Sequence, residues 1–249
     1  MGLRSGDARQ SATTDRGQPT LLPVQVAVID SGWDRSIPDA RVLQGHGFVE
    51  RGTRFALRRS EDDDDLIGHG TACADLVLQV APAASIIPLR VFDRGLETSA
   101  EVLVAALDAA ISIGVQVINM SLGTYLEAAL IPLYRATERA RQNGIVVVAS
   151  AYNRVGGGYP SVFHHVIGVD LGGDGGPFDF QFTELEAADC RVTNVARAAR
   201  TLRGECVDHR GTSFAAPVIT GKIATLLGSQ PGASLHEVKQ FLAKTATIR

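Results

Sequence analysis

The chain has 249 residues, which is enough to bury the core of one α/β domain. Hydrophobic residues make up 45% of it and charged residues 20%, and 24 basic residues against 27 acidic ones leave a net charge of −3. This balance excludes the basic surface that binds nucleic acid or an anionic membrane, and no stretch is long and apolar enough to span a bilayer. We expect neither nucleic-acid nor membrane partners.

The first 22 residues are polar and predict a flexible arm ahead of one domain over residues 23–249. They lack the apolar core of a secretory signal. The three cysteines, Cys73, Cys190 and Cys206, have no metal-ligand spacing. Their odd number, with the missing signal, favours a reducing, cytoplasmic setting. A disulfide between Cys190 and Cys206 is the alternative.

An almost unbroken apolar run over residues 24–29 predicts a strand that is buried on both faces of a parallel sheet. The run ends at Asp30, and ligands gather beyond the carboxyl ends of such strands. Asp30 is therefore a candidate site residue, with a turn-capping role as the alternative. The acidic run 61–65 precedes a predicted helix, whose dipole it complements, although most such runs are solvated loops.

His69 lies between two glycines in the first turn of a helix that we predict over residues 68–80. Glycine destabilises a helix, so a close approach of another backbone segment best explains both glycines. Cys73 follows one helical turn later on the same face, and we interpret it as a small buried residue beneath the histidine.

Strand and helix patterns alternate through the rest of the chain. We expect strands over residues 85–91, 115–120, 145–149 and 166–169, and helices over residues 97–113, 125–142, 213–228 and 234–245. The alternation predicts an α/β fold with a doubly wound parallel sheet and helices on both faces. Residues 171–210 show no clear pattern.

The stretch 211–217, GTSFAAP, leads into the helix predicted from residue 213. Pro217 is tolerated only near a helix start, so this helix should begin at about Thr212 or Ser213. Free amides and the helix dipole there would stabilise the oxyanion that forms when a serine attacks a carbonyl. An ordinary N-cap role for Thr212 or Ser213 is the alternative.

Asp30, His69 and Ser213 follow one another in the order Asp, His, Ser that subtilisin uses for its catalytic triad. Around them the sequence resembles the subtilisin-like serine proteases (subtilases, peptidase family S8), over about residues 23–246. Five stretches in the family's order carry the resemblance: VAVIDSG at 26–32, GHGTACA at 68–74, INMSLG at 118–123, ASAYN at 149–153 and GTSFAAP at 211–217.

The resemblance implies the three-layer subtilisin-like fold and a role for each site residue. Ser213 would be the nucleophile, His69 the general base and then acid, and Asp30 the group that orients the imidazole. Asn153 would donate a hydrogen bond to the oxyanion, together with the Ser213 amide. Cys73 is similar to the thiol that a subgroup carries under its catalytic histidine, which implies inhibition by mercurials.

Substrate binding is implied for residues on two further stretches. Ser121, Leu122 and Gly123 match the strand that pairs with extended substrate and walls the specificity pocket, to which Ser150 and Tyr152 would also belong. Tyr152 replaces the usual glycine, so we expect a preference for a small residue on the acyl side of the scissile bond. The family's Ala-Pro-Gly turn before the serine is replaced by residues 187–190, and its second histidine by Ala72.

The sequence therefore predicts a serine endopeptidase that acts on a peptide or protein. We expect that it needs no cofactor. Whether calcium stabilises the fold is left open, because the acidic run lacks the spacing of a calcium loop. Residues 1–22 are too short for an inhibitory pro-domain, so either the chain has been trimmed or it is an intracellular form that folds unaided. The second alternative favours a protease dedicated to peptide maturation. The alternatives are an inactive subtilase-fold module that binds peptides, and a peptide ligase or cyclase on the same scaffold. The oligomeric state is left open.

Overall fold

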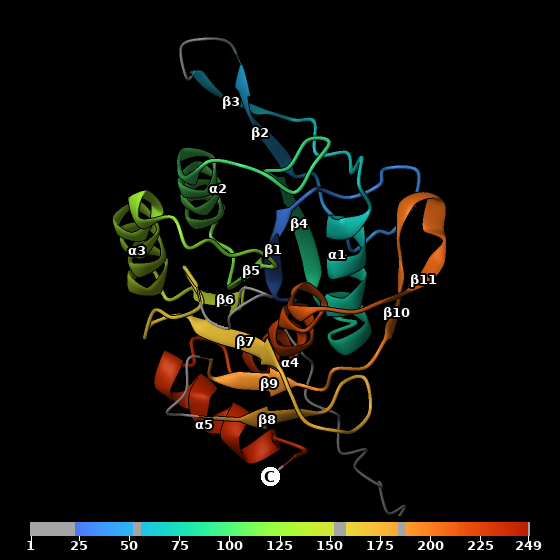
Figure 1. Ribbon diagram of the computed structural model, residues 1–249, viewed down its shortest axis with the longest axis vertical. Coiled ribbons are helices and arrows are strands. Elements are labelled where there is room, and N and C mark those ends of the chain that lie inside the picture. The colour runs from blue at the N-terminus through green and yellow to red at the C-terminus, as the bar shows by residue number, and fades with distance from the viewer. Residues whose placement is uncertain (1–22, 52–55, 152–157, 184–187, 249) are drawn as a thin grey trace, which may run out of the picture.

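A sheet of nine strands forms the centre of the molecule (Figure 1). The computed structural model describes residues 23–51, 56–151, 158–183 and 188–248. The strands of this sheet are β1 (Gln25–Asp30), β2 (His46–Arg51), β3 (Ala56–Ser60), β4 (Ser85–Arg90), β5 (Val117–Met120), β6 (Val146–Ser150), β7 (Ile167–Leu171), β8 (Phe180–Phe182) and β9 (Cys190–Val192).

The strand order is β3-β2-β4-β1-β5-β6-β7-β9-β8, so β1 lies in the middle of the sheet. All neighbours from β2 to β9 pair in parallel, and only the edge strands β3 and β8 pair antiparallel. In register, Val26 of β1 lies opposite Ile86 of β4 and Val117 of β5. Strands covered on both faces can be apolar throughout, which is why the central strands show unbroken apolar runs.

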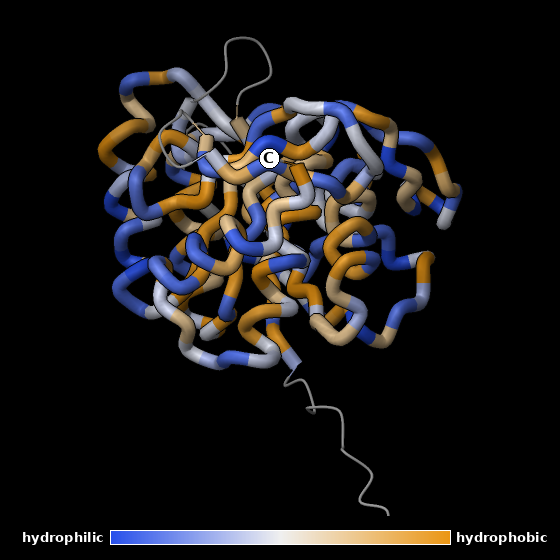
Figure 2. The backbone as a smooth tube through the Cα atoms, turned by 90° about the horizontal axis from the view of Figure 1, so that it is seen from below, coloured by the Kyte–Doolittle hydropathy of each residue, from blue (hydrophilic) through white to orange (hydrophobic). Residues whose placement is uncertain are grey.

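Helices cover both faces of the sheet, and this confirms the predicted α/β fold of three layers. The helices are α1 (His69–Val80), α2 (Ala100–Ile113), α3 (Glu127–Gln142), α4 (Ala216–Ser229) and α5 (Leu235–Thr245). Helices α2 and α3 lie on one face, and α1 and α4 lie on the other (Figure 1). Apolar side chains fill a separate core on each face of the sheet. Figure 2 shows how hydrophobic (orange) and hydrophilic (blue) segments alternate along the chain. None of the helices in the described part is long and apolar enough to cross a membrane.

Several strands were missed by the sequence analysis. The ribbon of β2 and β3 lies in a charged segment, and the unassigned residues 171–210 hold β8, β9 and a second sheet of β10 (Arg197–Arg200) and β11 (Cys206–His209). Strands β3 and β8 lie at the edges of the sheet, β9 to β11 have three or four residues each, and β2 carries charged residues, so none of them shows the long apolar run of the central strands. The cysteines are free thiols, and no Cys190–Cys206 disulfide is formed.

Candidate active site

Three parallel strands bring predicted site residues to one edge of the sheet. Asp30 ends β1, Ser150 ends β6, and Ser121 follows directly after β5. The side chains of all three are buried. His69, at the start of α1, and Ser213 reach the same edge, where His69, Ser121, Ser150 and Ser213 line a cleft of about 760 Å³. The fold thus brings together residues that are up to 183 positions apart, from Asp30 to Ser213.

Asp30 and His69 form a direct pair. The Nδ1 atom of His69 lies 2.7 Å from Oδ1 of Asp30, which also accepts a 2.7 Å hydrogen bond from the Ser31 amide. Burial alone would lower the pKa of His69, but the charge of Asp30 and its hydrogen bond outweigh it and raise this pKa. Because Asp30 holds the Nδ1 proton, the second ring nitrogen, Nε2, is left to act as a base.

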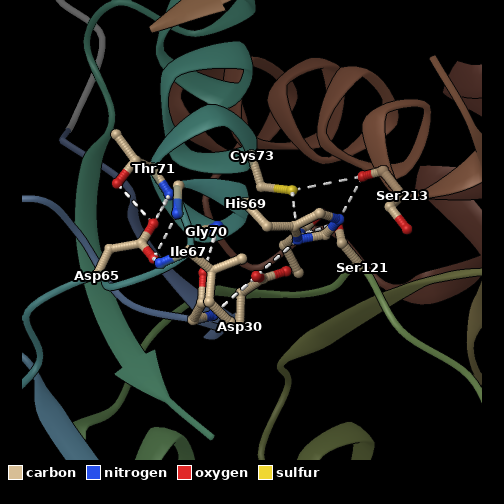
Figure 3. Close-up of polar contacts among 12 residues, drawn as sticks. Asp30, Asp65, Ile67, His69, Gly70, Thr71, Cys73, Ser121 and Ser213 are labelled. Carbon is tan, nitrogen blue, oxygen red and sulfur yellow. Dashed lines mark hydrogen bonds and ion pairs between the residues drawn. The ribbon is translucent and has the colours of Figure 1, made fainter. Parts of the chain in front are cut away.

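Asp65 fixes the start of the helix that carries His69 (Figure 3). One carboxylate oxygen accepts from the amides of Ile67 and Gly68, and the other accepts from the amide and the hydroxyl of Thr71. Asp63 and Asp65 are buried, so the acidic run is not a solvated loop at these two positions. Asp65 lies ahead of the first turn of α1, which holds no acidic residue, and accepts from the Thr71 amide within that turn, so the match of the run to the helix dipole stays a prediction. Nothing in the sequence indicated that this aspartate turns inward.

The glycine after His69 allows the helix to approach β1 closely. A Cβ atom at Gly70 would lie 2.5 Å from the carbonyl oxygen of Gly32, which is shorter than any tolerated contact. The Gly70 amide instead donates a 2.7 Å hydrogen bond to the Ser31 hydroxyl. Gly68 has a φ of 89°, a left-handed conformation that favours glycine. The predicted close approach of another backbone segment is therefore confirmed.

Ser213 lies in a 3₁₀ turn and not in the first turn of an α-helix. The turn spans Thr212–Phe214, and α4 begins only at Ala216. The prediction that the helix begins at Thr212 or Ser213 was therefore about three residues early. The reason is that the amides of Phe214 and Ala215 bond to carbonyls three residues back, which gives the tighter 3₁₀ geometry.

A buried hydrogen-bonded chain holds the backbone of Ser213. The Thr220 hydroxyl donates to Oδ1 of Asn119, whose amide nitrogen donates to Oγ of Ser121, each at 2.9 Å. The Ser121 hydroxyl donates a 2.7 Å bond to the carbonyl of Ser213, which faces Ser121 and Cys73 in Figure 3. Asn119 and Thr220 were not predicted, and Ser121 was assigned only to substrate binding. The signal that could have found Asn119 and Thr220 in the sequence is a polar residue within an otherwise apolar strand or helix.

Cys73 is fully buried beneath His69, as predicted. Its sulfur lies 3.9 Å from Nδ1 of His69 and donates to the Ser213 carbonyl at 3.5 Å. Burial raises the pKa of this thiol, although His69 opposes the shift, so Cys73 is a neutral packing group and not a second nucleophile. Within the described ranges, ligand atoms of Asp30, His69 and Cys73 lie within 4.8 Å of one another, so a soft metal ion bound there would block the base. Sensitivity to mercurials stays a prediction.

Two predicted site residues, Tyr152 and Asn153, lie outside the described residues. The segment that replaces the Ala-Pro-Gly turn is described from Ala188 onward. Here Asp189 accepts from the amide of Gly168 at 3.0 Å and from Nζ of Lys239 at 2.6 Å. These contacts tie the altered segment to β7 and α5.

Two further segments line the cleft. One segment runs from Ser121 through Leu122 and Gly123, both predicted to bind substrate, to Leu126. The other comprises the residues before α2 and the start of α2 itself, and it contributes Phe92, Leu96, Glu97, Thr98 and Leu103.

Comparison with known proteins places this geometry in a family. The model of the subtilase family, Peptidase_S8, matches residues 23–249. Subtilisin DY of Bacillus licheniformis is 30% identical over 242 residues, which cover 90% of this chain and 84% of the relative. The chain belongs to the subtilase family of serine endopeptidases.

Two further subtilases show how sequence identity and structural similarity to this chain vary within the family. Subtilisin E of Bacillus subtilis strain 168 is 31% identical over 235 residues, and the match covers 90% of this chain but 60% of subtilisin E. The crystal structure of an epidermin leader peptide processing serine protease from Staphylococcus aureus superposes with a TM-score of 0.72 at 18% identity, covering 90% of this chain and 70% of that one. The subtilase fold therefore persists where the sequences have diverged widely.

Proposed function

We propose that this subtilase hydrolyses peptide bonds through an acyl-enzyme formed on Ser213. The observation that carries the proposal is the buried 2.7 Å contact between Asp30 and His69, because His69 lines the cleft together with Ser213. A carboxylate, an imidazole and a hydroxyl at one cleft are the groups that nucleophilic catalysis by serine needs.

The proposed steps start with a proton transfer. His69 Nε2 takes the hydroxyl proton of Ser213 as Oγ attacks the substrate carbonyl, and the carbonyl oxygen becomes an oxyanion. The imidazolium then gives its proton to the leaving amine, and the C–N bond breaks. A water molecule, deprotonated by His69, then attacks the acyl carbon. The C–O bond to Ser213 breaks, the imidazolium returns its proton to Oγ, and the acid is released. The chain's own side chains carry each step, so no cofactor takes part.

Asp30 supports these steps by fixing the ring of His69 and by stabilising the imidazolium that forms twice in each cycle. Within the described residues, no hydrogen bond joins the Ser213 hydroxyl to His69. Such bonds are commonly long in the free enzyme and tighten only with substrate bound. The anchored carbonyl of Ser213 keeps the backbone of the nucleophile in place while its hydroxyl rotates.

The oxyanion donors in this proposal are the backbone amide of Ser213 and the side chain of Asn153. Two such donors aimed at the developing charge stabilise the transition state more than the ground state. Removing one of them typically costs about 10²–10³ in turnover.

For the substrate, we propose a precursor peptide bound in extended form along the cleft and cut once during its maturation, in the cytoplasm. The support is the open cleft beside the catalytic groups, together with the name of the epidermin leader peptide processing protease, which shares the fold. Tyr152 would narrow the pocket next to the scissile bond, and cleavage profiling that found large aromatic residues preferred there would contradict this part.

Labelling with a fluorophosphonate probe tests the reaction. The wild type should label on Ser213 and lose peptidase activity in parallel, whereas a folded Ser213→Ala variant should do neither. Intact mass before and after labelling, followed by peptide mapping, identifies the residue. A folded wild type that does not label would favour the inactive peptide-binding module instead.

A further inference from the structure

One carboxylate stands in the cleft beyond the catalytic residues. Among the described residues that line it, Glu97 is the single acidic side chain, and its neighbours are mostly apolar. It lines the same cleft as Leu122 and Gly123, and it lies three residues before α2 begins at Ala100. A ligand that fills the cleft must therefore pass this charge.

Glu97 has no basic partner in the described part of the chain. Some carboxylates in the structure are paired, for example Asp63 with Arg35, and Asp39 with Arg41 and Arg200. No ion pair or hydrogen bond of this kind is formed by Glu97, which is exposed at the cleft. Its charge is thus available to a ligand, and binding breaks no existing pair.

Exposed apolar side chains surround the same part of the cleft. Leu96, next to Glu97, is 54% exposed, and Tyr125 and Leu126, which line the same cleft, are 44% and 70% exposed. Large apolar groups that gather at one concave surface mark a binding site and not ordinary surface variation. They offer apolar contact to a side chain that enters beside the carboxylate.

We propose that Glu97 is a specificity-determining residue that selects substrates with a lysine or arginine on the acyl side of the scissile bond, next to a large apolar residue. The proposal rests on the proposed function, because it assumes that the cleft holds the acyl part of a peptide. Lysine and arginine suit this site, since their alkyl stems pack on leucine while their charged ends reach the carboxylate. A carboxylate in a partly enclosed, apolar cleft attracts a cation more strongly than one in open water.

Peptide binding to the Ser213→Ala variant tests the proposal without turnover. The probes are N-acetylated fluorescent octapeptides with a leucine at a fixed position and one lysine, glutamine or glutamate moved one position at a time. At one position the lysine peptide should bind about two- to fivefold more tightly than the glutamine peptide, and the glutamate peptide more weakly. The ratio should fall as salt rises from low to physiological concentration.

Substitution of Glu97 ties the effect to this residue. In the Ser213→Ala background, Glu97→Gln should remove the preference for lysine, and Glu97→Lys should reverse it in favour of glutamate. Glu101→Gln is the matched control, because Glu101 is also exposed and lies four positions later on α2, outside the cleft. Circular dichroism confirms that each variant is folded.

Two kinds of result would overturn the proposal. One is equal binding of lysine and glutamine peptides at all positions, or no binding of any peptide. The other is a lysine preference that survives Glu97→Gln, or one that appears only with a free N-terminus, which would assign the cation to the peptide amine. Failure of the proposed function is seen separately, as absence of fluorophosphonate labelling of Ser213 in the wild type.

Discussion

The catalytic edge of the sheet and the wall of the cleft are built in opposite ways. At the edge, polar side chains are buried and hydrogen-bonded to one another, as in the chain from Thr220 through Asn119 to Ser121. Along the cleft, leucines such as Leu96 and Leu126 are exposed. Groups that are fixed before the reaction need no reorganisation during it, whereas exposed apolar surface gains free energy only when a ligand covers it. Chemistry and selectivity should therefore respond to different substitutions.

The largest effect is expected at the edge, from Asp30→Asn. The amide cannot hold the Nδ1 proton of His69 in the same way, so kcat/KM should fall about 10⁴-fold, as it does when the same carboxylate is changed in other serine proteases. Asp30 also raises the pKa of His69, and without it burial lowers that pKa. Because only neutral His69 is a base, the acid limb of kcat/KM should move to lower pH in the variant.

A pH profile of kcat/KM from pH 5 to 10 checks both parts. Asp174→Asn, at an exposed aspartate away from the cleft, is the control and should leave rate and profile unchanged. A loss smaller than tenfold, or an acid limb that does not move, would show that Asp30 does not orient the base. The catalytic edge would then lack the preorganisation that distinguishes it from the cleft.

An effect of intermediate size is expected from Asp65→Ala, at the support of the catalytic edge. The buried carboxylate accepts four hydrogen bonds at the start of α1, and its loss leaves those donors unpaired. The free energy of unfolding should fall by about 2–3 kcal/mol. Urea denaturation measures it, and Glu61→Ala, at an exposed residue of the same acidic run, should change it by less than about 0.5 kcal/mol. Equal effects at both positions would mean that the run acts only through its net charge.

These contrasts also explain how far the sequence could predict the structure. The buried parallel strands were found to within one or two residues, because a strand covered on both faces is apolar along its whole length, as β1 and β6 are. The short strands β8 to β11 and the charged ribbon of β2 and β3 carry no such run, and they were missed. The edge strands β3 and β8 pair with the strands next to them in sequence, so short antiparallel pairs, and not long apolar runs, form these parts of the sheet.

The site was predictable only in part, for a related reason. The candidates Asp30, His69 and Ser213 were found from motifs at the ends of elements, and the fold then brought His69 and Ser213 to one cleft, with Asp30 buried against His69. Asp65 and Asn119 were not found, because the residue type alone does not show whether an aspartate or asparagine is buried or solvated. Tertiary packing alone decides which of them turns inward, so the groups that hold the candidate triad in place were the ones that sequence analysis missed.

The smallest effect is expected on the cleft wall, from Leu126→Ala. This residue is 70% exposed, so only the part of its apolar area that a substrate covers contributes to the free energy of substrate binding. KM for a peptide with a matching apolar residue should therefore rise about two- to fivefold. The rate of labelling by a small fluorophosphonate should not change, because the probe does not reach this wall. Ile131→Ala is the matched control, since Ile131 is an aliphatic residue on α3 that is 53% exposed and lies outside the cleft. If Leu126→Ala slowed labelling as much as peptide cleavage, the wall would be supporting the catalytic groups themselves. The separation between a preorganised edge and a selective cleft would then be wrong.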